Sequence, residues 1–170
     1  MNKKIDKNIY IAQTAKIGKN CSLGFNLCVF NNVEIGDNSY IGNNVVIHEG
    51  TKVAENTYID DGVVLGRVPC LGSTSKRKIK KLQPLKIGKD CIVGTNSIIY
   101  RGTIMGDRVM VGDLASIRER NIIGNDTIIG RLVMVELNTK IGSRVKIQAG
   151  THITGDMVIE NDVFIGSEIS

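Results

Sequence analysis

Aliphatic residues recur at every sixth position along most of the chain. A first series of eleven runs from Ile5 to Leu65, and a second series of fourteen runs from Ile87 to Ile165. A spacing of six fits no helical face, which needs a spacing near 3.6, but it fits a short strand and a tight turn repeated around a coil. The pattern therefore predicts an all-β solenoid in which three hexads make one coil.

Two further phases of the hexad support this interpretation. The position four residues after each aliphatic residue is mostly small or β-branched, as in Ala15, Thr57 and Ser97, which indicates a second inward-facing position. Thirteen of the 19 glycines follow an aliphatic position directly, where they mark turns. Each strand then pairs with its counterpart one coil away, and each coil buries its interior only when coils above and below cover it.

The two series are out of phase, because Leu65 and Ile87 are 22 residues apart. The segment 67–86 between them holds both prolines and a cationic run. We expect a loop over 67–86 that interrupts a single β-helix domain spanning 1–170. The chain ends at Ser170 in mid-hexad without a capping helix, and we therefore expect a truncated C-terminus.

The net charge of +5 and the pI near 9.1 favour anionic partners. The basic run contains no aromatic residue on which bases could stack, so nucleic acid is disfavoured as a partner. No stretch has the apolar length of a signal peptide or of a membrane-spanning helix. We expect a cytoplasmic protein that binds no membrane.

Cysteines and histidines give little indication of metal binding. The four cysteines form no CxxC pair, which favours buried free thiols over zinc ligands or disulfides. The only two histidines, His48 and His152, are too few for the three-histidine zinc site of a carbonic anhydrase, and we expect no metal. Neither histidine has an obvious carboxylate beside it, so an exposed structural role is favoured for both. His48 is a second candidate for a general base.

Charged residues at outward corners are the main candidates for chemistry. Asp113 and Arg131 share one corner in successive coils, about 4.8 Å apart along the axis. They can form an ion pair, or Asp113 can orient or deprotonate an attacking amine. Glu119 has the same phase on the next corner. Both interpretations of Asp113 stay open.

Stacking also predicts two structural contacts. Arg118 and Glu136 are 18 residues apart, so they should lie at one corner and pair. Asn121 faces inward between Thr103 and Thr139, where a buried polar ladder is expected.

The basic loop is a candidate phosphate contact. Lys76 and Arg77 could bind a nucleotide pyrophosphate or the phosphates of CoA, or they could belong to a solvated loop. The segment 72–76 lacks the glycine spacing of a P-loop.

Nearly the whole chain resembles the hexapeptide-repeat superfamily, and that resemblance implies a left-handed parallel β-helix. The stretch 85–136 is similar to N-acyltransferases that modify amino sugars on nucleotide carriers, which share a D-L-A-x-x-R-E segment. Here Asp113, Leu114, Ala115, Arg118 and Glu119 match it. The resemblance implies a homotrimer with active sites between subunits, acetyl-CoA or another short acyl-CoA as donor, and Asp113 near the sugar amine.

We therefore take Asp113, Glu119 and His48 as catalytic candidates. The candidates for substrate binding are Arg118, Glu136, Asn96, Lys76 and Arg77.

Two other functions remain open. One is O-acetyl transfer to a sugar or serine hydroxyl, which requires a base more strongly than transfer to an amine does. The other is a non-catalytic β-helix that serves as a rigid assembly subunit. A histidine in the intersubunit cleft favours O-transfer, whereas a carboxylate alone favours transfer to an amine.

Overall fold

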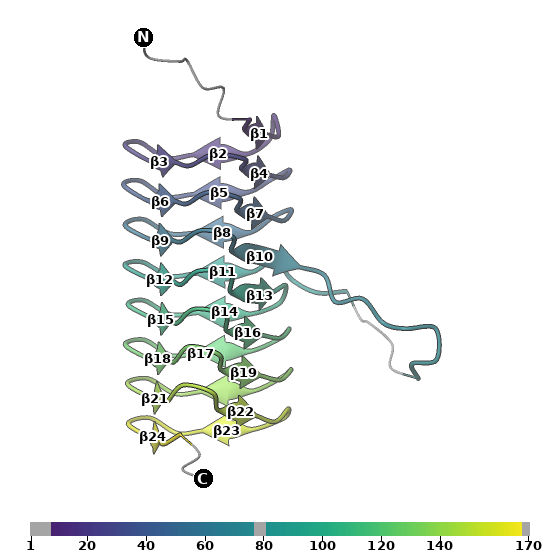
Figure 1. Ribbon diagram of the computed structural model, residues 1–170, viewed down its shortest axis with the longest axis vertical. Coiled ribbons are helices and arrows are strands. Elements are labelled where there is room, and N and C mark those ends of the chain that lie inside the picture. Colours follow the sequence, from purple (N-terminus) through teal and green to yellow (C-terminus); the bar gives the residue numbers. More distant parts are fainter. Residues whose placement is uncertain (1–7, 77–80, 168–170) are drawn as a thin grey trace.

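The computed structural model describes residues 8–76 and 81–167 as 24 short strands with no helix among them. The strands wind into a left-handed parallel β-helix, as predicted. Figure 1 shows the coils stacked along one axis, with the two chain ends at opposite ends of the stack and one loop projecting from its side. Three parallel sheets of eight strands form the sides of the coil.

Sheet A supplies the side from which the loop departs. Its first four strands, in spatial order, are β1 (Tyr10–Ile11), β4 (Cys28–Val29), β7 (Val46–Ile47) and β10 (Val64–Arg67). Its last four are β13 (Ile98–Tyr100), β16 (Ser116–Ile117), β19 (Met134–Val135) and β22 (His152–Ile153).

Sheet B follows sheet A in each coil. It begins with β2 (Lys16–Ile17), β5 (Glu34–Ile35), β8 (Lys52–Val53) and β11 (Lys86–Ile87). It continues with β14 (Ile104–Met105), β17 (Ile122–Ile123), β20 (Lys140–Ile141) and β23 (Val158–Ile159).

Sheet C completes each coil. It contains β3 (Ser22–Leu23), β6 (Tyr40–Ile41), β9 (Tyr58–Ile59) and β12 (Ile92–Val93). The remaining strands are β15 (Met110–Val111), β18 (Ile128–Ile129), β21 (Lys146–Ile147) and β24 (Phe164–Ile165). We call the turns that join these sheets the A–B, B–C and C–A corners.

The interior of the coil is filled by the two predicted phases. The aliphatic positions from Val29 to Ile159 are buried, and the positions four residues later, such as Val63 and Thr127, lie beside them. Most inward hydroxyl and thiol groups donate to a carbonyl fifteen residues later in the chain. Ser97 Oγ donates to Gly112 O at 2.8 Å, and Thr127 Oγ1 donates to Gly142 O at 2.9 Å. Stacked coils therefore satisfy most of the polar side chains that they bury.

The inserted loop is slightly shorter than predicted. Arg67 belongs to β10 and Lys86 to β11, so the excursion from the coil spans 68–85. A register shift between Leu65 and Arg67 places this departure at a β-bulge, where Gly66 has a φ of 73°. The chain then leaves sheet A and returns in sheet B, so the loop projects from the A–B corner (Figure 1).

All four cysteines are free thiols, as expected, but they are not all buried. Cys91 is buried, Cys21 and Cys28 are partly buried, and Cys70 on the loop is exposed. Burial raises the pKa of the Cys91 thiol. Its Sγ lies 3.2 Å from Gly106 O, in the same relation as the inward hydroxyls, so this thiol has a structural role.

Candidate functional site at the A–B corner

The A–B corner differs from the other two corners at the first residue of its turns. At the B–C and C–A corners this residue is mostly glycine, because the next coil approaches closely. A Cβ on Gly36 would lie 2.4 Å from Glu55 N, and one on Gly112 would lie 2.5 Å from Arg131 N. At the A–B corner the same position carries large or polar side chains in a column down the molecule. We call these residues the corner column: Phe30, His48, Tyr100, Arg118, Glu136 and Thr154.

The lower half of the corner column holds a charged network. Arg118 Nε lies 3.1 Å from Glu119 Oε2, and Arg118 Nη1 lies 3.9 Å from Glu136 Oε2. The guanidinium also lies over the ring of Tyr100, 5.2 Å from its centroid. The predicted pairing of Arg118 with Glu136 is therefore confirmed, although the shorter ion pair is with Glu119.

Glu119 is fully buried, which its outward phase did not predict. The side chain of Arg118 is 28% exposed, so the pair is largely shielded from water and the attraction between its charges is strong. Tyr100, one coil earlier, and the carboxylate of Glu119 both contact the guanidinium. Nη1 of the same guanidinium is the atom nearest to Glu136.

A buried ladder fixes the turn that carries this pair. Asn121 Nδ2 and Thr103 Oγ1 both donate to Arg118 O, at 2.9 and 2.8 Å. Asn121 Oδ1 accepts from Thr139 N at 2.7 Å. This arrangement confirms the ladder predicted from the spacing of the three residues.

His152 lies beside Glu136, with 3.7 Å between Nε2 and Glu136 Oε1. The expectation that no carboxylate neighbours this histidine was therefore wrong. Residues at the same phase of successive coils are 18 apart, whereas these two are 16 apart and meet diagonally across sheet A. Long side chains reach such diagonal neighbours. His152 is exposed and also lines a small hollow of about 250 Å³ with Gly150, Thr151 and Gly166.

The upper half of the column is aromatic. The ring of His48 stacks on Phe30 with centroids 5.5 Å apart and planes 9° apart. Burial lowers the pKa of His48, and the nearby charges of Arg67 and Arg101 lower it further. The neutral imidazole is thus favoured, which is the form that a general base requires.

The base of the loop separates the two halves. Arg101 donates from Nη1 to Glu49 O at 2.6 Å and from Nε to Leu82 O at 3.2 Å, so it ties the returning chain to the turn after β7. Lys76 is exposed on the projecting segment, and Arg77 lies outside the described residues.

The structure places Asp113 and Asn96 at the C–A corner, on the other edge of sheet A. Asp113 Oδ1 accepts from Thr95 N at 3.1 Å, which links two coils. Within the described part of the chain, Asp113 and Arg131 form no ion pair, so the first of the two interpretations left open for Asp113 is not supported. Within one subunit, the predicted site residues therefore fall into two groups on two corners. The catalytic assignment of Asp113 stays a prediction.

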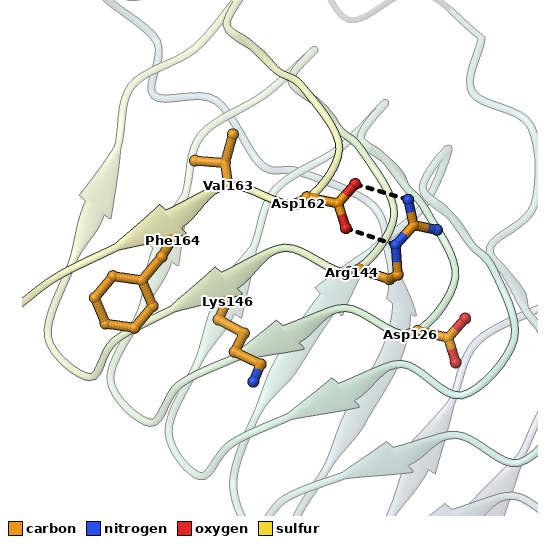
Figure 2. A pocket seen from close by; sticks show the side chains of 6 residues that line it. All are labelled: Asp126, Arg144, Lys146, Asp162, Val163 and Phe164. Atoms are coloured by element: carbon orange, nitrogen blue, oxygen red, sulfur yellow. Dashed lines mark hydrogen bonds and ion pairs between the residues drawn. The ribbon is translucent and has the colours of Figure 1, made fainter.

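The B–C corner carries an open pocket of about 530 Å³ near the last coil. Figure 2 shows Asp126, Arg144, Lys146, Asp162, Val163 and Phe164 around it. Arg144 donates to both carboxylate oxygens of Asp162, at 2.6 and 2.7 Å, and Arg108 binds Asp126 in the same way. The strongest cations and anions here already neutralise one another, so we assign this pocket a structural role.

No three His, Cys, Asp or Glu side chains in 8–76 and 81–167 are grouped so that they could hold a metal ion. Over the same residues, no helix is long and apolar enough to cross a membrane.

Two protein families match parts of the chain. "Bacterial transferase hexapeptide (six repeats)" matches residues 32–67. "Hexapeptide repeat of succinyl-transferase" matches residues 14–49 and 84–112. Both matches lie on coils of the β-helix. No curated protein matches the chain in sequence.

Solved structures share the fold at low sequence identity. The UDP-N-acetylglucosamine acyltransferase of Francisella novicida has a TM-score of 0.81 at 17% identity, and the match covers 96% of this chain and 63% of that protein. The corresponding enzyme of Campylobacter jejuni has a TM-score of 0.68 at 16% identity, with 92% and 69% covered. A hexapeptide transferase family protein of Anaplasma phagocytophilum has a TM-score of 0.55 at 18% identity, with 90% and 70% covered.

The chain thus spans less than two thirds of the length of the Francisella protein. Hexapeptide repeats of transferases thus match two parts of the chain, on either side of the inserted loop, and the chain shares its β-helix fold with these acyltransferases.

Proposed function

We propose that the protein is an N-acyltransferase that moves a short acyl group, such as acetyl, from CoA to the amino group of a nucleotide-linked sugar. The observation that carries this proposal is the position of Glu136 between Arg118 and His152 at the A–B corner. Assembly as a trimer, with this corner facing a cleft between subunits, follows from the family resemblance and is part of the proposal.

The carboxylate of Glu136 is suited to an amine acceptor. It is half-buried and lies within 3.7 Å of an imidazole, so it can attract an ammonium group to a position where His152 can take a proton. The neutral amine then attacks the thioester carbonyl, the C–N bond forms and the C–S bond breaks. The proton taken from the ammonium passes from His152 to solvent, and the proton that nitrogen loses as the amide forms passes through His152 to the departing CoA thiolate.

Arg118 has a positioning role in this scheme. Its guanidinium is fixed by Glu119 and Tyr100 and keeps Glu136 oriented. Such pre-organisation contributes to rate because little rearrangement is needed at the moment of reaction.

A basic loop at the same corner supports a phosphate-bearing acceptor or donor. Lys76 lies on this loop, and Arg67 lies at its base. The two UDP-N-acetylglucosamine acyltransferases with the same fold are named for a nucleotide sugar, which is the acceptor class that we propose here.

A second candidate is O-acyl transfer to a sugar hydroxyl. The pairing of His152 with Glu136 favours it, since a neighbouring carboxylate can orient an imidazole and a hydroxyl nucleophile needs a base. The two reactions use the same corner and differ in the acceptor atom.

The test measures the release of CoA from acetyl-CoA and from longer acyl-CoAs. The acceptors are pairs of nucleotide sugars that differ only in carrying an amine or a hydroxyl at one carbon. Mass spectrometry should identify the products, because thiol reagents would also react with the exposed Cys70. Product from the amino sugar alone supports N-transfer, and product from the hydroxyl sugar alone establishes O-transfer. No product with any pair would overturn both and favour the non-catalytic assembly subunit.

Variants at the corner should then locate the site. Glu136→Gln and His152→Gln are each expected to lower kcat/KM by about 100-fold. Arg144→Gln, at the self-neutralised B–C corner, is the matched control and should leave activity unchanged.

A further inference from the structure

The third residue of each turn makes a hydrogen bond that repeats along the coil. Its backbone N–H donates to the carbonyl of the second turn residue in the preceding coil, as Asn138 N donates to Glu119 O at 3.1 Å. The bond is made at all three corners. The other residues that donate in this way are Asn38, Asn44, Gly50, Asn56, Gly62, Asp90, Asn96, Arg108, Leu114, Asp126, Leu132, Arg144, Gly150, Asp156 and Asp162.

Two turns depart from this rule, and they are the first two A–B turns after the inserted loop. Neither Gly102 N nor Arg120 N donates to an acceptor among the described residues. Arg101 accounts for the first case, because its Nη1 donates to Glu49 O at 2.6 Å, which is the carbonyl that Gly102 N would otherwise use. Backbone N–H groups are strong donors, so these two are left to bind solvent or a ligand.

The guanidinium of Arg120 also differs from its counterparts at the B–C corner. Arg120 has a φ of 64°, and Arg108 and Arg144 share this left-handed conformation, but those two each donate twice to an aspartate one coil later. One coil after Arg120 lies Asn138, which is neutral and donates to Asp156 Oδ1 at 2.6 Å. Over residues 8–76 and 81–167, Arg120 therefore forms no ion pair.

The side chain of Arg120 lies against the base of the loop. A Cβ built on Gly102 would be 3.5 Å from both Arg120 Cγ and Leu82 Cδ2, so these two side chains meet over the glycine. Arg101 Nε donates to Leu82 O at 3.2 Å, and Lys81, the residue before Leu82, is exposed. Three cationic residues thus gather around Leu82, where the loop returns to the coil.

The carboxylate that precedes Arg120 in the chain is engaged elsewhere. Glu119 is buried and lies 3.1 Å from Arg118 Nε. The segment 67–86 contains seven Lys or Arg residues and no Asp or Glu, so the net charge of +5 originates in this segment. Positive charge accumulates around the two donor groups.

We propose that Gly102 N, Arg120 N and the guanidinium groups of Arg101 and Arg120 bind a phosphate group. The two N–H groups lie one coil apart, about 4.8 Å along the axis, a distance that a phosphate or a pyrophosphate can bridge. Adjacent backbone N–H groups form anion sites, and charged donors strengthen their hydrogen bonds to phosphate oxygens. Arginine suits this role because its planar group presents several donors at once.

The identity of the ligand rests on the proposed function, because CoA and a nucleotide-linked sugar both carry phosphates. Arg120 belongs to the same turn as Arg118, which lies beside Glu136, so the phosphate would be held next to the proposed acceptor site. The two proposals can fail separately. A chain that transfers acyl groups without binding phosphate here would lose this inference and keep the other.

The test is a titration of the full-length chain, without acyl donor, followed in amide NMR spectra. The probes are inorganic phosphate, UDP and CoA, each added at the same ionic strength, because salt screens charge. The amide signals of Gly102 and Arg120 should shift with at least one probe. The amides of Gly50 and Asn138 are the internal controls, since they already donate to carbonyls, and they should stay in place.

The matched variants are Arg120→Asn and Arg144→Asn. Asparagine suits the positive φ at both positions, so both variants should fold. Arg120→Asn should raise the dissociation constant of the bound probe at least tenfold, whereas Arg144→Asn, which removes an arginine already paired with Asp162, should leave it unchanged. The wild-type titration decides by itself if Arg120→Asn does not fold.

The relative affinities of the probes identify the source of the phosphate. Tighter binding of UDP than of CoA assigns the site to the acceptor, the reverse assigns it to the donor, and equal affinities for all three probes assign it to the phosphate group alone. Unchanged Gly102 and Arg120 signals with about 10 mM of every probe would overturn the proposal. Equal affinity in Arg120→Asn and the wild type would do the same.

Discussion

The A–B and B–C corners are built from the same hexad but use it differently. At the B–C corner, asparagines one coil apart bond to one another from Asn20 through Asn38 to Asn56, and further down arginines pair with aspartates. These asparagines, arginines and aspartates are thus paired between successive coils. At the A–B corner the contacts run diagonally, a carboxylate is buried and the chain leaves the coil altogether.

The departure of the loop has a measurable cost at the A–B corner. Most other inward hydroxyls donate to the carbonyl of the residue fifteen positions later, but for Thr51 that residue is Gly66, at the bulge. Among the described residues, Thr51 Oγ1 is the buried side-chain oxygen without a partner. The corner at which the repeat breaks is thus also the one that gathers the charged network of Arg118, Glu119 and Glu136.

The largest effect should come from exchanging turn residues between the corners. Gly36→His at the B–C corner would place a Cβ 2.4 Å from Glu55 N, so unfolding should require about 3 kcal/mol less free energy. His48→Gly at the A–B corner should cost about 1 kcal/mol, mostly from the greater freedom of glycine and the lost stacking on Phe30. Urea denaturation measures both. Equal losses would show that the corners do not differ in their tolerance of side chains.

A slightly smaller effect is expected for Arg118→Met. The variant removes a guanidinium that lies 3.1 Å from the buried carboxylate of Glu119. Because Glu119 has a further contact, the loss should be about 2 kcal/mol, below the usual cost of breaking a buried pair. Arg144→Met, which breaks the exposed pair with Asp162, is the control. If both variants unfold at the same denaturant concentration, burial of the Glu119 pair contributes nothing.

Threonine-to-valine changes test the cost of the bulge. Thr51→Val should leave stability unchanged or raise it by about 1 kcal/mol, since a buried hydroxyl without a partner is removed. Thr127→Val should lower stability by about 1 kcal/mol, because Thr127 Oγ1 donates to Gly142 O and accepts from Val145 N. The midpoint temperature of thermal unfolding should therefore fall for Thr127→Val. For Thr51→Val it should rise or stay unchanged. Equal destabilisation would mean that Thr51 has a partner in solution.

The smallest expected effect is the pH dependence of His48. Its pKa is lowered by burial and then by Arg67 and Arg101, so the folded state binds fewer protons than the unfolded state just below the ordinary value of 6.5. Its contribution to stability is present above pH 6.5 and is lost as the pH falls through the folded-state pKa. NMR titration should give a midpoint below 6.5 that rises in Arg67→Gln, and Arg131→Gln at the distant C–A corner is the control. An unchanged midpoint in Arg67→Gln would remove that charge as a cause.

Much of the fold was predictable because it repeats. The period of six assigned the inward and outward positions, and the break in phase located the inserted loop within one residue at each end. The spacing of 18 residues predicted the pairing of Arg118 with Glu136 and the polar ladder through Asn121. Local strand and turn preferences favour the same conformation as coil stacking at these positions. The sequence pattern alone is therefore sufficient to predict the coil.

The candidate site depended on relations that the period does not contain. The inserted loop breaks the spacing of 18 residues between equivalent positions. Only the pairing of Leu65 with Ile99 shows that His48 and Arg118 belong to one corner. The contact of His152 with Glu136 runs diagonally between coils, and the burial of Glu119 follows from how its turn packs. The sequence by itself determined the coil and its phases, because these arise from short-range periodicity. The tertiary structure decided which charged side chains meet, because that depends on side-chain reach and on the path of the chain around the inserted loop.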